Sequence, residues 1–125
     1  MATLAPTLSR SDAEVLSRAL AKLADFWGFS NAKLGAVLGI SAATVSRIRS
    51  GGSVLDPASK SFEAGQFLLR LFRGLDALMG SNDDASRRWL ATRNLDLDAR
   101  PLDLIDSFKG LITVCDYVDA HRARV

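Results

Sequence analysis

Residues 41–50 carry hydroxyl and guanidinium groups at spacings that suit hydrogen bonding to a nucleic acid. On a helix, Val45 and Ile48 would mark an apolar face, and the polar residues would lie on the opposite face. Such groups bind base edges and phosphates when a helix enters the major groove of DNA. We expect Arg47 to contact a base edge or a phosphate, and Lys33 and Arg49 to contact phosphates. The residues predicted to face DNA are Lys33, Ser41, Ala42, Ala43, Thr44, Ser46, Arg47, Arg49 and Ser50.

The stretch 31–50 predicts the two helices that must position this face. Gly39 interrupts the first helix and supplies the positive φ of a tight turn, and Ser41 then caps a second helix. Gly35 stands where the two helices approach too closely for a side chain. The apolar residues that would hold the pair together are Leu34, Leu38, Ile40, Val45 and Ile48. This pattern favours a helix-turn-helix over an ordinary helical hairpin in an all-α core.

Charge is unevenly distributed along the chain of 125 residues. Residues 1–60 hold seven basic and four acidic residues, whereas residues 61–125 hold nine basic and ten acidic residues. A basic N-terminal half followed by a mildly acidic C-terminal half fits a DNA-binding domain joined to a second domain. Because this basicity is modest, we expect tight DNA binding to need a dimer or a larger assembly.

The cysteine content and the hydropathy pattern narrow the class of protein. Cys115 is the single cysteine of the chain, which excludes an internal disulfide and a cysteine-based zinc site. It falls on the apolar stripe of a predicted helix, so we expect its thiol to be buried. The first twelve residues contain no long apolar run, so we expect no signal peptide. No segment approaches the length of about 18 apolar residues that predicts a membrane span. The expected location is the cytoplasm, with no membrane partner.

Helix signals dominate the whole chain and predict an all-α fold. A capping box of Ser11 and Glu14 would begin the first helix, and Gly28 would end it. The apolar face expected on that helix is Val15, Leu16, Ala19, Leu20, Leu23, Phe26 and Trp27. A long helix over residues 59–79 is apolar around more than half its circumference, which predicts burial on several sides. We expect this helix to lie between the two halves of the chain. It would be either a self-association surface or the core helix of a monomer. We therefore predict a helix-turn-helix bundle at residues 1–58 and a small helical domain at residues 59–125.

The last predicted helix, from Phe108 to Ala123, carries two stripes. The expected core face is Phe108, Leu111, Ile112, Cys115 and Val118. An adjacent face and the basic tail comprise Val114, Tyr117, His121, Arg122, Arg124 and Val125. Tyrosine and arginine are frequent at protein-binding hot spots. Spacing alone nevertheless favours a solvated, fraying C-terminus over a binding edge.

The rear half resembles the toxin-binding domain of the Xre/MbcA/ParS antitoxins. The resemblance rests on Trp89-Leu90, on Arg100-Pro101-Leu102-Asp103-Leu104, and on Gly110. The front half resembles the Xre-like helix-turn-helix that these antitoxins carry, so the likeness covers residues 11–125. The family often has a glycine just before the Arg-Pro pair, where this chain has Asp98-Ala99. This difference from the family bears on the backbone geometry of the loop before Arg100.

This resemblance implies a function that composition does not show. It implies an antitoxin that covers the active site of a co-encoded RES-domain toxin, an enzyme that consumes NAD or transfers groups from it. It also implies binding to operator DNA, a homodimer, and larger complexes with toxin. The toxin-binding residues expected from this likeness and from the second stripe are Val114, Tyr117, His121, Arg122, Arg124 and Val125.

Enzymatic activity, a metal and a cofactor are not expected. The chain has one histidine, one cysteine and no glycine-rich phosphate loop, and its carboxylates are spread over caps and loops. Two alternatives to the antitoxin remain open. One is a stand-alone regulator whose C-terminal half only dimerises or senses a ligand. The other is a toxin-binding protein whose helix-turn-helix is purely structural, because Ala42, Ala43 and Ser46 offer bases few hydrogen bonds.

Overall fold

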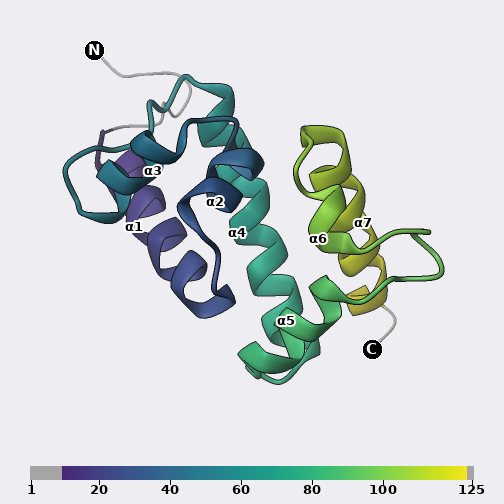
Figure 1. Cartoon of the computed structure of the whole chain (residues 1–125). Coiled ribbons are helices and arrows are strands. Elements are labelled where there is room, and N and C mark those ends of the chain that lie inside the picture. The colour runs from purple at the N-terminus through teal and green to yellow at the C-terminus, as the bar shows by residue number, and fades with distance from the viewer. Residues whose placement is uncertain (1–9, 124–125) are drawn as a thin grey trace, which may run out of the picture.

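The computed structural model describes residues 10–123, and within this range it contains helices and no strand (Figure 1). The helices are α1 (Arg10–Trp27), α2 (Asn31–Leu38), α3 (Ala42–Arg49), α4 (Lys60–Leu78), α5 (Asp83–Ala91), α6 (Pro101–Leu104) and α7 (Phe108–Ala123). The predicted all-α fold is therefore confirmed. No helix among the described residues is long and apolar enough to cross a membrane.

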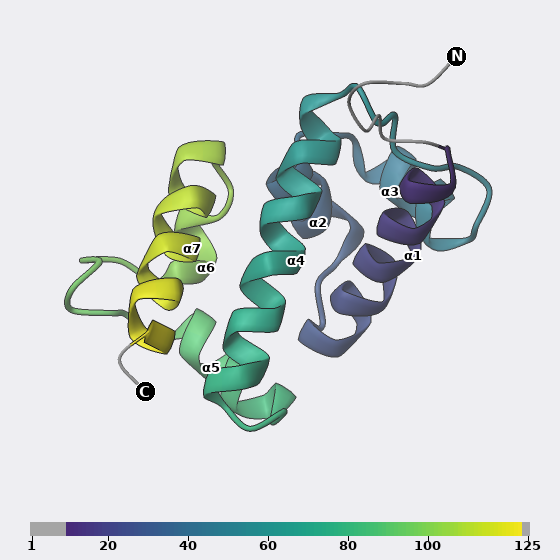
Figure 2. The same ribbon diagram turned by 180° about the vertical axis from the view of Figure 1, so that it is seen from behind.

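Helix α4 lies between the two halves of the molecule, as its apolar circumference predicts. It packs against α1 and α2 on one side and against α7 on the other (Figures 1 and 2). Two glycines permit these contacts. A Cβ added at Gly65 would lie 2.8 Å from Leu20 Cδ1 of α1, and one at Gly74 would lie 2.8 Å from Val118 Cγ1 of α7. The core is therefore continuous through α4 from the front half to the rear half.

Side-chain caps begin four of the described helices, and the cap at Ser41 is where the sequence predicts it. Ser30 and Ser41 accept hydrogen bonds from the backbone N–H three residues on, as do Ser59 and Asn82 at the starts of α4 and α5. Each cap satisfies an N–H group that has no partner within its helix. Ser11, which the sequence predicts as the cap of the first helix, instead lies inside α1 because that helix already includes Arg10. The predicted capping box of Ser11 and Glu14 is therefore not the start of α1.

Two residues assigned to the buried face of α1 are exposed. Val15 and Phe26 are 61% and 47% exposed, whereas Leu16, Leu20 and Trp27 are buried. The predicted apolar face of α1 was too wide. Helix α1 packs against the core through a narrower set of residues, and Val15 and Phe26 at the two edges of that face are in contact with solvent. Phe26 is still held at its edge, since its ring stacks on Phe72 of α4 with centroids 6.0 Å apart.

Candidate functional site

The turn between α2 and α3 has the geometry that its sequence predicts. Gly39 adopts a left-handed φ of 75°, and its N–H donates to the Gly35 carbonyl oxygen over 2.8 Å. A Cβ at Gly35 would lie 2.5 Å from the Ile40 carbonyl oxygen, so this position excludes a side chain. Ser41 then begins α3, where its Oγ accepts from Thr44 N over 3.1 Å. Helices α2 and α3 thus form a helix-turn-helix with a close crossing.

The outer face of α3 presents most of the residues predicted to meet DNA. Helix α3 lies at the edge of the molecule far from α7 (Figure 1). Its exposed residues are Ser41, Ala42, Ala43, Ser46, Arg47 and Ser50. Arg47 Nη2 donates to Thr44 Oγ1 over 3.1 Å, and Thr44 Oγ1 lies 2.9 Å from Ser41 Oγ. Among the described residues Arg47 has no carboxylate partner, so this hydroxyl chain orients a guanidinium whose charge is not neutralised.

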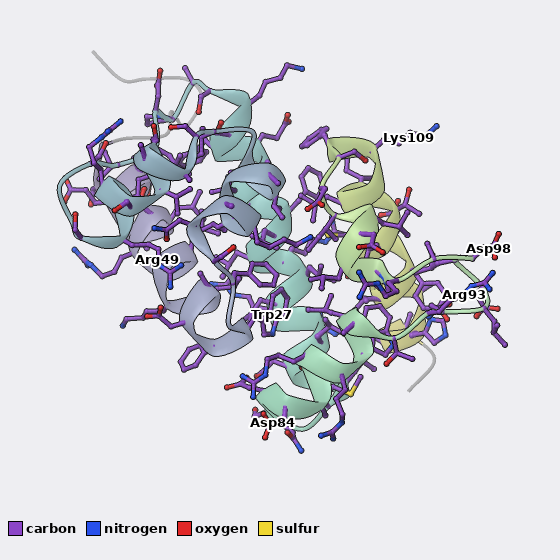
Figure 3. The ribbon with its side chains drawn as sticks, viewed as in Figure 1. Trp27, Arg49, Asp84, Arg93, Asp98 and Lys109 are labelled. Carbon is purple, nitrogen blue, oxygen red and sulfur yellow. The ribbon has the colours of Figure 1, made fainter. Side chains whose placement is uncertain are left out.

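The other two cations predicted at phosphates have partners within the chain. Arg49 donates to the Phe29 carbonyl oxygen over 2.8 Å and pairs with Asp25 over 2.5 Å, which ties the end of α3 to the α1–α2 connection (Figure 3). Lys33 Nζ lies 2.5 Å from the Leu102 carbonyl oxygen and 2.6 Å from Asp106 Oδ1. These contacts join the helix-turn-helix to the segment around α6. Lys33 and Arg49 therefore hold elements of the fold together, a role that their charge alone did not indicate.

Three aromatic side chains form a row where α5 and α7 meet. Tyr117 stacks on Trp89 with centroids 6.2 Å apart, and its ring lies at a tilt against His121 with centroids 4.2 Å apart. The Tyr117 hydroxyl donates to Asp96 Oδ2 over 2.7 Å. His121 Nδ1 lies 2.9 Å from the Tyr117 carbonyl oxygen, which can only accept, so Nδ1 carries the proton and Nε2 faces away from this bond. We call Trp89, Tyr117 and His121 the aromatic row.

The remaining residues of the predicted toxin-binding edge do not all reach the surface. Val114 is 0% exposed, which corrects its assignment as a contact residue. Helix α7 packs against both α4 and α6, so its buried face is broader than one stripe and includes Val114. Arg122 is exposed and lies beside a groove between α1, α4 and α7. Arg124 and Val125 lie outside the described residues.

A protruding loop beside the aromatic row was not identified from the sequence. Asn94 and Ala99 form an antiparallel bridge, with Asn94 N donating to the Ala99 carbonyl oxygen over 2.9 Å. Arg93 pairs with Asp98 across this turn, and both residues are labelled in Figure 3. We call residues 93–99 the α5–α6 loop. The signal that could have located the turn is Asn94, whose side chain accepts from two backbone N–H groups further along the loop.

Two family models match the chain in tandem. Residues 6–73 match the antitoxin Xre-like helix-turn-helix domain, and residues 74–124 match the antitoxin Xre/MbcA/ParS C-terminal toxin-binding domain. The chain belongs to the Xre-like antitoxins. The two matches meet inside α4, which packs on both halves. No curated protein matches the chain at a significant level.

The signature residues of the antitoxin's rear half shape its fold. Arg100 donates two hydrogen bonds to Asp103, of 2.9 and 2.8 Å, and these bonds lower the pKa of the Asp103 carboxyl. Pro101 is the first residue of α6, where its missing N–H costs nothing. A Cβ at Gly110 would lie 1.9 Å from the Leu104 carbonyl oxygen, so only glycine lets α7 begin against α6.

The departure at Asp98-Ala99 concerns backbone geometry in the antitoxin. Asp98 adopts a left-handed φ of 54°, the conformation that glycine takes most easily. Aspartate is among the few other residues that tolerate it, because its short polar side chain can bond locally. Here the Asp98 carboxylate pairs with Arg93. The loop therefore keeps a glycine-like turn without a glycine.

The antitoxin's cysteine has no chemical role that its surroundings support. Cys115 is buried, and its Sγ lies 3.2 Å from the Phe67 carbonyl oxygen. Burial raises the pKa of this thiol to about 12, so the nucleophilic thiolate is scarce. Within residues 10–123 there is no group of histidine, cysteine or acidic residues that could hold a metal. One matched model describes a toxin-binding domain and the other a helix-turn-helix domain.

Proposed function

We propose that this antitoxin inhibits a RES-domain toxin and represses its own operon. Its C-terminal domain would cover the active site of a toxin that consumes NAD or ADP-ribosylates a target. The observation that carries the proposal is the tandem match of a helix-turn-helix domain and a toxin-binding domain over residues 6–124. The RES class of the toxin rests on the resemblance of the signature segment Arg100–Leu104 to the antitoxins that bind it.

The toxin contacts proposed here are Tyr117, His121, Arg122, Arg124 and Val125. Support comes from the aromatic row, which combines stacked apolar surface with ring and hydroxyl polar groups. Arg122 adds a positive charge at the end of α7. The arginines of this tail would donate hydrogen bonds to carboxylate or carbonyl groups of the toxin around its active site. The target DNA and NAD both lie in the cytoplasm, which is where we propose that the antitoxin acts.

Repression would use the outer face of α3, with Arg47 as its main polar reader. We propose that the antitoxin binds operator DNA as a homodimer, because a single short recognition helix contacts only one half-site. The first half of the chain carries a net charge of only about three, which further limits the affinity of one copy. Two copies would bind two half-sites, and toxin would assemble on the dimer.

The decisive experiment is capture of the tagged antitoxin from its native host, followed by washing in high salt and mass spectrometry. We expect a stoichiometric RES-domain protein encoded in the same operon. Purified partner should consume NAD, and added antitoxin should stop that reaction. A gel shift on the upstream DNA at several salt concentrations tests repression. DNA binding without a protein partner would establish the stand-alone regulator instead, and a partner without DNA binding would mean that the helix-turn-helix is only structural.

A further inference from the structure

Leu95 is the most exposed large apolar side chain among the described residues. It is 86% exposed at the α5–α6 loop. Phe26 and Phe108 are also partly exposed, but each packs on another ring, Phe26 on Phe72 and Phe108 on Phe67. No aromatic contact covers Leu95. An exposed leucine alone is ordinary on a protein surface, so its surroundings decide what it means.

The loop that carries Leu95 is held in one shape from both sides. The Asn94 side-chain oxygen accepts from Asp96 N over 2.9 Å and from Leu97 N over 3.1 Å. Leu97 turns inward and packs against the core, while Leu95 faces solvent. The ion pair of Arg93 and Asp98 closes the loop. None of these contacts uses the Leu95 side chain, so the loop is ordered before any partner arrives, and binding loses less conformational entropy.

Leu95 is continuous with the aromatic row. Its neighbour Asp96 accepts the hydrogen bond of the Tyr117 hydroxyl, and the Tyr117 ring contacts those of Trp89 and His121. All of these residues fall within the stretch that matches the toxin-binding domain. The loop extends from the molecule beside α7 in both views (Figures 1 and 2). An apolar tip on a rigid loop at the border of a polar-aromatic surface has the arrangement of a binding anchor.

We propose that Leu95 anchors the antitoxin on its toxin by inserting into an apolar pocket of the toxin surface beside the contacts of the aromatic row. This inference rests on the proposed function, because it takes the toxin as the partner of residues 74–124. It adds a second point of attachment, from a loop between α5 and α6, to the edge and tail of α7. Two separated attachments would constrain the orientation of the toxin more than the edge and tail of α7 alone.

The test is a calorimetric titration of the purified full-length antitoxin with the RES-domain protein encoded in its operon. Leu95→Asp and Leu95→Ser should each weaken binding about tenfold to a hundredfold, as expected for a buried anchor. Leu95→Met should bind nearly as well as the wild type, because it retains an apolar side chain of similar volume. Thermal unfolding and the gel shift on operator DNA should not change in any of these variants.

Ala36→Asp is the control, because Ala36 is also an exposed apolar residue but lies on α2 in the front half. It should leave toxin affinity unchanged. The anchor is overturned if both polar variants at Leu95 bind the toxin like the wild type, or if Ala36→Asp weakens binding as much as they do. Failure of the wild type itself to bind the RES-domain protein would overturn the proposed function together with the anchor.

Discussion

Lys33 of α2 and Asp106 at the end of the α6 segment join the two halves of the antitoxin through an ion pair of 2.6 Å. The same ammonium donates to the Leu102 carbonyl oxygen over 2.5 Å. A cation that the sequence places among DNA contacts thus holds the helix-turn-helix against the toxin-binding domain. Arg87 of α5 makes a parallel link, donating to the Phe26 carbonyl oxygen over 2.5 Å.

Lys33→Ala should lower the free energy of unfolding by about 1 kcal/mol, since it removes one partly exposed ion pair and one hydrogen bond to a carbonyl. Urea denaturation measures this change. Lys22→Ala is the control, because Lys22 is exposed on α1 and should be nearly neutral. Equal stability of the two variants would show that the Lys33 contacts do not hold the halves together.

Arg47→Ala should weaken operator binding by about 1–3 kcal/mol if its guanidinium makes a bidentate contact with a base. It should leave toxin inhibition intact, because Arg47 lies on α3 far from the aromatic row. Gel shifts and an NAD-consumption assay measure the two activities separately. The control is Arg88→Ala, an exposed arginine on α5. Loss of toxin inhibition in Arg47→Ala would contradict the separation of the two modules.

Gly110→Ala should destabilise the antitoxin by about 1–3 kcal/mol, because a backbone oxygen must move to admit the new methyl group. The added Cβ would lie 1.9 Å from the Leu104 carbonyl oxygen. The gain in helix propensity, about 1 kcal/mol, is too small to offset that displacement. Gly52→Ala is the comparison, since its Cβ would meet nothing nearer than 3.7 Å. Equal melting temperatures for the two variants would show that α6 and α7 adjust freely.

Cys115 should resist thiol reagents in the folded antitoxin. Burial raises its pKa to about 12, so at pH 8 the thiolate is far scarcer than in the unfolded chain. We expect labelling in buffer to be at least about a hundredfold slower than in urea. The raised pKa also makes the stability of the antitoxin depend on pH, because the folded state disfavours the thiolate. The free energy of unfolding should be highest below the pKa of the unfolded thiol and should decline as pH rises above it. Rapid labelling of the native chain would contradict the burial.

Deleting residues 121–125 should reduce toxin inhibition and leave DNA binding unchanged, because His121 and the basic tail lie at the end of the toxin-binding domain. Inhibition of NAD consumption and the operator gel shift measure the two effects. His121→Ala serves as the smaller change, since it removes one ring of the aromatic row without removing the tail. Full inhibition by the truncated chain would show that the tail does not block the toxin's active site.

The sequence by itself determined the features that depend on neighbours a few residues apart. Ser30, Ser41 and Asn82 cap their helices through bonds to an N–H three residues on, and Gly39 turns the chain because only its own φ is at issue. The clash at Gly35 involves the Ile40 carbonyl, five residues away. Such local relationships can be inferred from residue type and spacing.

Only the tertiary structure decided which side chains are available to partners. Lys33 meets Leu102, 69 residues away, and Val114 is buried because α7 packs against two other helices. Leu95 reaches solvent because Leu97 takes the inward position in the same loop. Charge and hydropathy describe what a residue can do, but exposure and pairing depend on elements brought together by packing, and this long-range packing is absent from residue spacing.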